Sequence, residues 1–181
     1  MENKLKNRRL SIRQMTMIGM LSAISIFLGI TGLGFIPLPT MRATIMHVPV
    51  IIGAIIEGPV VGALVGLVFG LFSMYQNFTA PGPTSFIFWN PIIAIIPRVL
   101  VGIVAYYVYR TLYNKIKKES ISIAIASLLA SFTNTAGVLS LAYLFYLEKY
   151  SAALGINPDT AAVAIAGIGT AAVSGLIPNA A

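Results

Sequence analysis

The sequence predicts an all-α integral membrane protein, in which six transmembrane helices form one compact bundle over residues 1–181. Composition is the first observation: 57% of the residues are hydrophobic, 9% are charged and the mean hydropathy is +0.89, whereas a soluble domain carries roughly 25% charged residues. The second is that polar, turn-forming stretches divide the chain into six apolar segments. The third is that basic residues gather beside these segments, as they do at cytoplasmic membrane flanks.

The placement of the basic residues explains the net charge of +7 without a nucleic-acid partner. Nine of the twelve Lys and Arg residues fall in two clusters that abut apolar segments: Lys4, Lys6, Arg8, Arg9, Arg13 and Arg110, Lys115, Lys117, Lys118. If both clusters are cytoplasmic, the chain must cross the membrane an even number of times between Arg13 and Arg110. Four apolar segments lie in that interval, so we expect both termini to face the cytoplasm.

The first apolar segment, 13–33, ends in a Gly- and Pro-rich stretch that predicts a turn or loop reaching residue 42. The second and third segments, 43–57 and 60–75, are separated by Gly58-Pro59. We predict two helices joined by a tight interfacial turn, with a single long kinked helix as the alternative. The even crossing count favours two helices.

The stretch 76–90 is polar, rich in turn formers and aromatic at its end, and it is the longest loop between apolar segments. The fourth, fifth and sixth segments follow at 91–109, 120–147 and 160–181. A loop of this length exceeds a simple connection, so we expect it to form the rim or lid of an outward-facing site. Its candidate substrate-binding residues are Asn77, Thr84, Ser85, Trp89 and Asn90.

Arg98 lies about seven residues into the fourth segment, roughly 10 Å below the outer interface at ~1.5 Å per residue. A charge at that depth costs at least ~2.5 kcal/mol unless it faces a polar cavity or a counter-ion. The neighbouring Pro97 predicts a local break in helical hydrogen bonding that opens carbonyl groups. A substrate carboxylate is one expected partner; structural pairing with Glu148 or Asp159, or snorkelling, is the alternative.

Two further polar residues are candidates for substrate binding. His47, the only histidine, lies about one turn into the second segment, and it is expected to hydrogen-bond either within the bundle or to a ligand. Asn134 is an amide in apolar surroundings that needs polar partners, either on another helix or on a substrate.

Several kinds of chemistry lack the residues that they need. The chain has no cysteine and a single histidine, so we expect no disulfide and no metal site. It has no Gly-rich phosphate loop, no supported Ser-His-Asp arrangement and no pair of buried carboxylates. We therefore predict no cofactor and no enzymatic activity, and we expect another subunit to drive any transport.

Small residues recur at four-residue spacing, which lets helix backbones approach closely in lipid. These rows are Gly62, Gly66 and Gly70; Ala126 and Ala130; Gly167, Ala171 and Gly175; and Gly19 and Ala23. Packing within the bundle is one interpretation, and a docking face for another membrane protein is the other. Gly19 and Ala23 are the candidates for docking.

Several stretches resemble a known family, the S-components of energy-coupling-factor vitamin importers. Residues 43–54 (ATIMHVPVIIGA), Gly58-Pro59 and 62–66 (GALVG) resemble the second and third helices of these proteins. Similar stretches are 83–88 (PTSFIF), 96–102 (IPRVLVG) and 131–135 (SFTNT), so the resemblance covers nearly the whole chain. Within the family the sequence is most similar to pantothenate-specific members, while riboflavin, folate and cobalamin members share the fold.

The resemblance implies a six-helix subunit in the bacterial cell membrane that captures a water-soluble vitamin from outside and topples to release it inward. A shared transmembrane coupling protein and two ATP-hydrolysing subunits would supply the energy. The family's docking motif has small residues four apart on the first helix; here they are Gly19 and Ala23, with glycine in place of the more usual alanine. Pantothenate carries one carboxylate, which agrees with Arg98 as its counter-charge. A small polytopic membrane enzyme or assembly factor is the alternative from another class.

Overall fold

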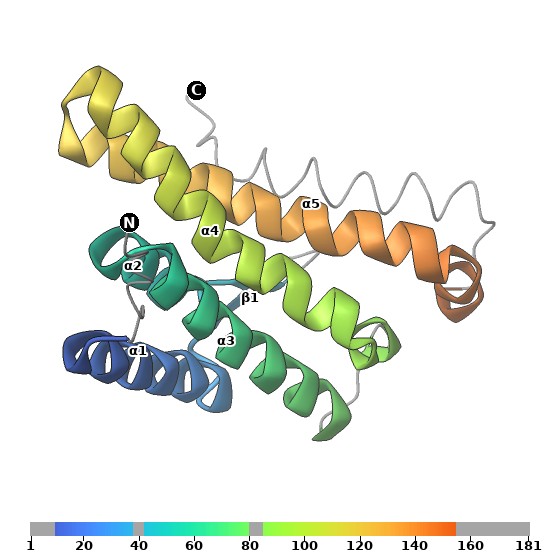
Figure 1. Ribbon diagram of the computed structural model, residues 1–181. Coiled ribbons are helices and arrows are strands. Elements are labelled where there is room, and N and C mark those ends of the chain that lie inside the picture. Colours follow the sequence, from blue (N-terminus) through green and yellow to red (C-terminus); the bar gives the residue numbers. More distant parts are fainter. Residues whose placement is uncertain (1–9, 38–41, 80–84, 155–181) are drawn as a thin grey trace, which may run out of the picture.

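The computed structural model describes residues 10–37, 42–79 and 85–154. Its elements are α1 (Ile12–Ile30), β1 (Phe35–Pro37), β2 (Arg42–Thr44), α2 (Val48–Glu57), α3 (Pro59–Thr79), the 3-10 helix η1 (Ser85–Trp89), α4 (Pro91–Ile116) and α5 (Glu119–Leu154). Figure 1 shows the long helices side by side in the order α1, α3, α4, α5, while α2 packs on α1, α3 and α4. The predicted sixth segment, 160–181, lies outside the described residues.

Four described helices are long and apolar enough to cross a membrane: α1, α3, α4 and the Glu119–Phe145 part of α5. Their outer faces carry large exposed apolar side chains, including Phe27, Leu71 and Leu144. Water would not tolerate so much apolar surface, whereas lipid accepts it. The chain is a multi-pass membrane protein, and the prediction of a helical bundle is confirmed for these helices.

Helix α2 is shorter than the predicted segment 43–57, because a β-hairpin that starts in the expected loop extends into this segment with strand β2. Pro49 has no amide hydrogen for a helical bond to Ile45, so it suits the first turn, and the helix begins at Val48. Its ten residues span about 15 Å, half of a hydrocarbon core of ~30 Å.

The hairpin provides hydrogen-bond partners for part of the backbone that precedes the short helix and is not helical. Strands β1 and β2 pair antiparallel, and the amide of Ile45 donates to the Gly34 carbonyl at 2.9 Å. Non-helical backbone at membrane depth is tolerated where it is buried in protein or lines a polar cavity. Strand β2 ends three residues before His47, so this break in the helical pattern lies close to a candidate site residue.

Helices α2 and α3 are separate helices, as the interfacial-turn prediction requires. Gly58 alone joins them, with φ of 105°, a conformation that residues with a Cβ rarely adopt. The two helices pack against each other beyond the turn, since a Cβ on Gly62 would contact the Ala54 side chain.

The glycine row of α3 packs against α4. A Cβ on Gly66 would contact the carbonyl oxygen of Arg98, and a Cβ on Gly70 would lie 2.8 Å from the carbonyl oxygen of Ala94. Such close backbone approach is what small residues permit in lipid. This row therefore serves packing within the bundle.

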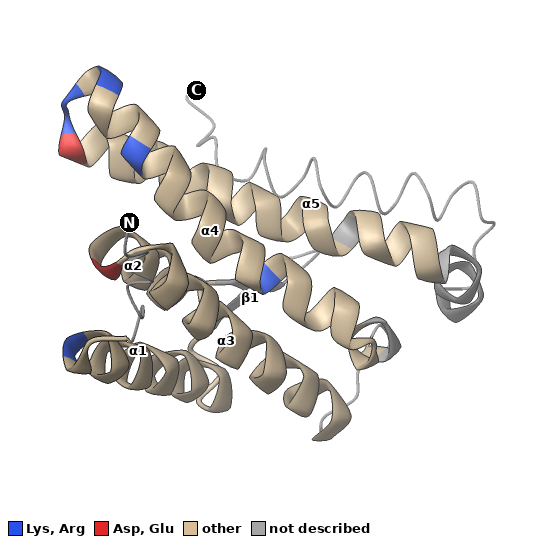
Figure 2. Ribbon diagram, in the orientation of Figure 1, with Lys and Arg blue, Asp and Glu red and all other residues tan. Residues whose placement is uncertain are grey.

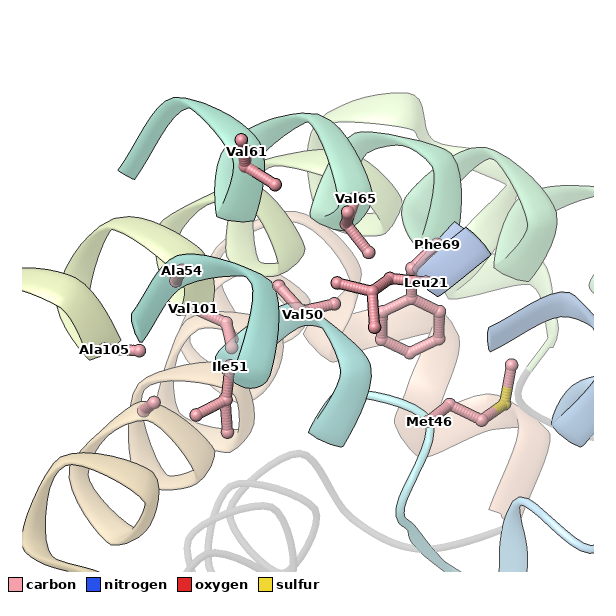
Figure 3. Close-up of a cluster of buried hydrophobic side chains, with 11 residues drawn as sticks. Leu21, Met46, Val50, Ile51, Ala54, Val61, Val65, Phe69, Val101 and Ala105 are labelled. Atoms are coloured by element: carbon pink, nitrogen blue, oxygen red, sulfur yellow. The ribbon is translucent and has the colours of Figure 1, made fainter. Parts of the chain in front are cut away.

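A buried apolar cluster holds the helices together, as Figure 3 shows. It consists of Leu21, Met46, Val50, Ile51, Ala54, Val61, Val65, Phe69, Val101, Ala105 and Ala130. The five α-helices and the turn before α2 all contribute to this cluster, which makes it the centre of the bundle. Phe69 also faces Arg98, so the apolar cluster borders this candidate site residue.

Among the residues coloured in Figure 2, charged residues gather at one end of the molecule. Arg98 is the exception, since it lies in the first half of α4. At the charged end Arg13 Nε and Glu57 Oε1 form an ion pair of 2.6 Å. The start of α1, the α2–α3 turn and the α4–α5 turn lie at the same end of the bundle, as the even crossing count requires. That this end faces the cytoplasm stays a prediction.

Candidate functional site

Arg98 is buried in the first half of α4, with 6% of its surface exposed. Its Nη1 donates a hydrogen bond of 2.8 Å to the Ile93 carbonyl. Its Nε is buried and has no hydrogen-bond partner in the described part of the chain. The guanidinium is therefore held at one nitrogen and keeps unused donor capacity at another.

Two aromatic rings from different elements face this guanidinium. The Arg98 Cζ lies 5.8 Å from the centre of the Phe69 ring on α3 and 5.0 Å from that of Phe88 on η1. Both separations fall within the range of cation–π attraction. No carboxylate pairs with Arg98 among residues 10–37, 42–79 and 85–145; the Glu148 side chain and Asp159 lie outside what the structure describes.

His47 lies in the turn before α2 and not one turn inside a helix as expected, because the helix begins at Val48. Its Nε2 is 2.7 Å from Ser131 Oγ on α5, which makes the hydrogen bond within the bundle that was one of the two expectations. Its Nδ1 is buried without a partner among the described residues. Nε2 thus bonds within the bundle, while Nδ1 can still form a hydrogen bond with a ligand.

Asn134 lies on α5 between Ser131 and Gly137, and the contacts of these two residues show which part of the bundle Asn134 faces. Three residues earlier, Ser131 reaches His47; three residues later, a Cβ on Gly137 would lie 3.1 Å from the Pro97 side chain. Residues at this spacing share one side of a helix, so Asn134 faces the region between His47 and the Pro97–Arg98 stretch. Its Oδ1 is buried and unpartnered within the described chain.

Asn77, Ser85 and Trp89, which the sequence placed in the loop, are joined by hydrogen bonds, and Phe78 stacks on Trp89. Ser85 Oγ donates to Asn77 Oδ1 at 2.8 Å, and Trp89 Nε1 donates to the Asn77 carbonyl at 3.2 Å. The Phe78 and Trp89 rings stack with centres 5.6 Å apart. We call Asn77, Phe78, Ser85 and Trp89 the η1 clasp, because together they fasten η1 to the end of α3.

The other predicted residues are not part of the η1 clasp. Asn90 caps α4, since its Oδ1 accepts a hydrogen bond of 3.0 Å from the Ile92 amide. Thr84 lies outside the described residues. Gly19 and Ala23 are exposed on the outer side of α1, and a Cβ on Gly19 would meet nothing within 4 Å.

Sequence reasoning missed three contributors to the site: Phe69, Phe88 and Ser131. Phe69 has no polar neighbour along the chain to mark it, and only the packing of α3 on α4 brings it to Arg98. Phe88 belongs to the aromatic run at 86–89, and Ser131 precedes Asn134 by one helical turn. The sequence signal that could have identified Phe88 is its place in this aromatic run, and for Ser131 it is the helical spacing from Asn134.

Together, Arg98, Asn134 and His47 have the chemistry of a binding site for a small anionic molecule that also carries uncharged polar groups. It offers a cationic donor at Arg98, an acceptor at Asn134 and a tautomer-dependent group at His47, each with an unpartnered buried atom in the described structure. Buried polar groups without partners are rare, and each costs about 1–3 kcal/mol. In the same part of the chain, no group of His, Cys, Asp and Glu residues could hold a metal ion.

Comparisons with known proteins point to membrane transport. A family model described as "ECF transporter, substrate-specific component" matches residues 13–181. The "Pantothenic acid transporter PanT" of Lactococcus lactis subsp. cremoris is 39% identical over 124 residues, which are 61% of this chain and 60% of that protein. The "Pantothenate transporter PanT" of Leuconostoc mesenteroides subsp. mesenteroides is 35% identical over 119 residues, 62% of this chain and 58% of that protein. The chain thus matches about three fifths of the length of each relative.

Proposed function

Because the chain belongs to the family of substrate-specific components of energy-coupling-factor transporters, we propose that it is the high-affinity pantothenate-binding subunit of such an importer. The family consists of transporter subunits and not of enzymes. The observation that carries the choice of an anionic substrate is Arg98, a buried cation with an unpartnered Nε in the described structure. Pantothenate is the choice among anionic vitamins because two relatives are named for its transport.

In this proposal each polar group of the site binds one part of the vitamin. Pantothenate has a carboxylate, a central amide and two hydroxyl groups. Arg98 binds the carboxylate, and the Asn134 Oδ1 accepts from the amide N–H or a hydroxyl. His47 Nδ1 bonds to a hydroxyl in the tautomer that its contact with Ser131 selects.

We further propose how the bound vitamin is delivered. The exposed small residues Gly19 and Ala23 dock α1 on a shared transmembrane coupling protein, which two ATPase subunits energise. The subunit then topples in the membrane and opens its site inward. The family membership and the outward exposure of these two residues support this part of the proposal. A six-helix bundle with both termini in the cytoplasm belongs to the same proposal.

The test is a calorimetric titration of the purified chain with pantothenate, riboflavin, folate and cobalamin. We expect pantothenate to bind with micromolar or tighter affinity and the other three to bind much more weakly. Preferential binding of another vitamin would reassign the substrate within the family. Turnover of a substrate by the isolated chain would instead support the membrane enzyme.

A further inference from the structure

Pro97 lies inside α4, one residue before Arg98. In a regular α-helix the amide of residue 97 donates to the carbonyl of residue 93. Proline has no amide hydrogen, so the Ile93 carbonyl loses that donor. The structure shows the replacement: Arg98 Nη1 donates to the Ile93 carbonyl at 2.8 Å.

We propose that Pro97 is a positioning residue for substrate binding. By withholding its amide, it leaves the Ile93 carbonyl free to hold the Arg98 guanidinium in the orientation that a planar carboxylate requires. The inference rests on the proposed function only for the identity of the anion. The arrangement of Pro97, Ile93 and Arg98 is a property of α4 itself.

The geometry of a guanidinium explains why this hold matters. In a guanidinium, Nε–H and one Nη2–H point in parallel along one edge, and a carboxylate can accept both hydrogen bonds at once. The Ile93 carbonyl occupies Nη1, which belongs to the opposite side of the group. The Nε at the binding edge is unpartnered in the described part of the chain. The internal bond therefore orients the arginine without consuming the edge that binds.

Neighbouring elements keep this stretch of α4 in place. Pro97 is fully buried, and a Cβ on Gly137 of α5 would lie 3.1 Å from its side chain. On the other side, Gly66 of α3 lies against the Arg98 carbonyl. Phe69 and Phe88 limit the guanidinium further. A side chain held this way loses less conformational entropy when a ligand binds.

The test restores the missing amide. Pro97→Ala and Pro97→Val both supply an N–H for the Ile93 carbonyl, and valine keeps more of the buried ring volume. We expect pantothenate affinity to fall about three- to thirtyfold, while the affinity for panthenol, its neutral alcohol analogue, changes less than about twofold. Melting temperature should not fall in Pro97→Val, because proline is the least favourable residue inside a helix.

Pro91→Ala is the matched control, because Pro91 begins the same helix and its missing amide breaks no intrahelical bond. We expect wild-type binding of both compounds. Unchanged pantothenate affinity in both Pro97 variants, or an equal loss for acid and alcohol, would overturn the positioning role. Failure of the wild-type chain to bind pantothenate would count against the proposed function instead.

A second measurement does not depend on the vitamin. Side-chain ¹⁵N relaxation reports the fast mobility of the Arg98 Nε–H, and the signal is assigned by its loss in Arg98→Lys. We expect an ordered side chain in the wild type and a more mobile one in both Pro97 variants. Equal mobility in all three proteins would refute the hold on Arg98, whichever ligand the site takes.

Discussion

Arg98 is stabilised in the apolar bundle by a hydrogen bond and two aromatic rings, and by no ion pair that the structure describes. A charge at this depth costs at least ~2.5 kcal/mol. The bond to the Ile93 carbonyl and two aromatic rings offset part of that cost, each ring by up to about 2 kcal/mol when desolvated. Among the side chains that the structure describes, no carboxylate neutralises this positive charge. Within this part of the chain, a substrate anion can therefore interact with Arg98 without displacing another carboxylate.

The first prediction concerns the Arg98 side chain itself. Arg98→Lys keeps the charge but loses the planar edge that matches a carboxylate, so pantothenate should bind more weakly. Arg98→Ala should weaken binding further, about tenfold to a hundredfold, because a charge-assisted hydrogen bond contributes about 1.5–3 kcal/mol. Panthenol should lose less. Calorimetric titration of both compounds, with melting temperature as the folding control, measures this.

Equal losses for acid and alcohol, or simple unfolding of the variants, would make Arg98 a structural residue. The substrate's charge would then have to be neutralised elsewhere, and the pantothenate assignment would lose its main physical support.

Among the helices, α3 contacts two different elements: its glycine row packs against α4, and its last turns hold η1. Its glycine row brings the backbone within contact of α4 at Ala94 and Arg98. Its last turns carry Asn77 and Phe78, which fasten η1 and so place Phe88 beside Arg98. One helix therefore fixes both the backbone and the aromatic surroundings of the same arginine.

The second prediction is that Gly66→Ala destabilises the bundle. The added Cβ would overlap the Arg98 carbonyl, and overpacking of this kind costs about 1–3 kcal/mol, which exceeds the gain of up to about 1 kcal/mol in helix propensity. Thermal unfolding in detergent should show a lower melting temperature. Gly19→Ala is the matched control, because its Cβ would meet nothing within 4 Å and should leave stability equal or higher. Equal melting temperatures for the two variants would contradict the packing role of Gly66.

The third prediction concerns the η1 clasp. Asn77→Ala removes the acceptor of the Ser85 hydrogen bond, so η1 should become more mobile and pantothenate affinity should fall about twofold to tenfold. Trp89 is the only tryptophan of the chain, so its fluorescence reports the clasp directly, and its emission should shift to longer wavelength.

Thr79→Val is the control for the clasp, since the Thr79 hydroxyl bonds only within its own helix in the described structure. It should leave Trp89 emission and binding unchanged. If Asn77→Ala also changes neither, the clasp does not shape the site.

At the scale of the whole molecule, the outer surface is apolar while the polar residues of the site face inward. Helix α1 illustrates the outer surface: Met15, Gly19, Ala23 and Phe27 form an exposed row at four-residue spacing. Within that row Gly19 and Ala23 form a shallow stretch between two larger side chains, which lets another helix approach closely. The row lies on the opposite side of α1 from Leu21 and Ser25, which face the bundle.

The fourth prediction separates docking from binding. Gly19→Leu or Ala23→Leu should impair pantothenate uptake by the assembled transporter while leaving pantothenate affinity of the isolated chain nearly intact, because the added bulk blocks helix–helix approach on the outer face. Met20→Leu, at another exposed position of α1, should affect neither property. Uptake of radiolabelled pantothenate and calorimetry of the same variants provide the two readouts. A parallel loss of affinity would mean that these residues support the fold instead.

Element ends show where prediction from the sequence stops. The fourth and fifth segments were expected to end at residues 109 and 147, yet α4 continues to Ile116 and α5 to Leu154. Hydropathy marks where side chains leave the lipid, whereas the backbone hydrogen bonds of a helix continue into water. The opposite error occurs at α2, where apolar residues before Pro49 suggested a helix that proline prevents.

The amino-acid sequence alone predicts the membrane environment, the existence and order of the five α-helices, the turn at Gly58 and the depth of Arg98 in its apolar segment. These follow from local properties: transfer of apolar side chains into lipid, the backbone freedom of glycine, and the absence of charge around a single arginine. The folded structure is needed to show that Arg98 is buried and contacts Phe69 and Phe88, that His47 contacts Ser131, and that Asn77 fastens η1. Such contacts depend on the rotation and separation of packed helices, and these are set by many side chains acting together across the bundle.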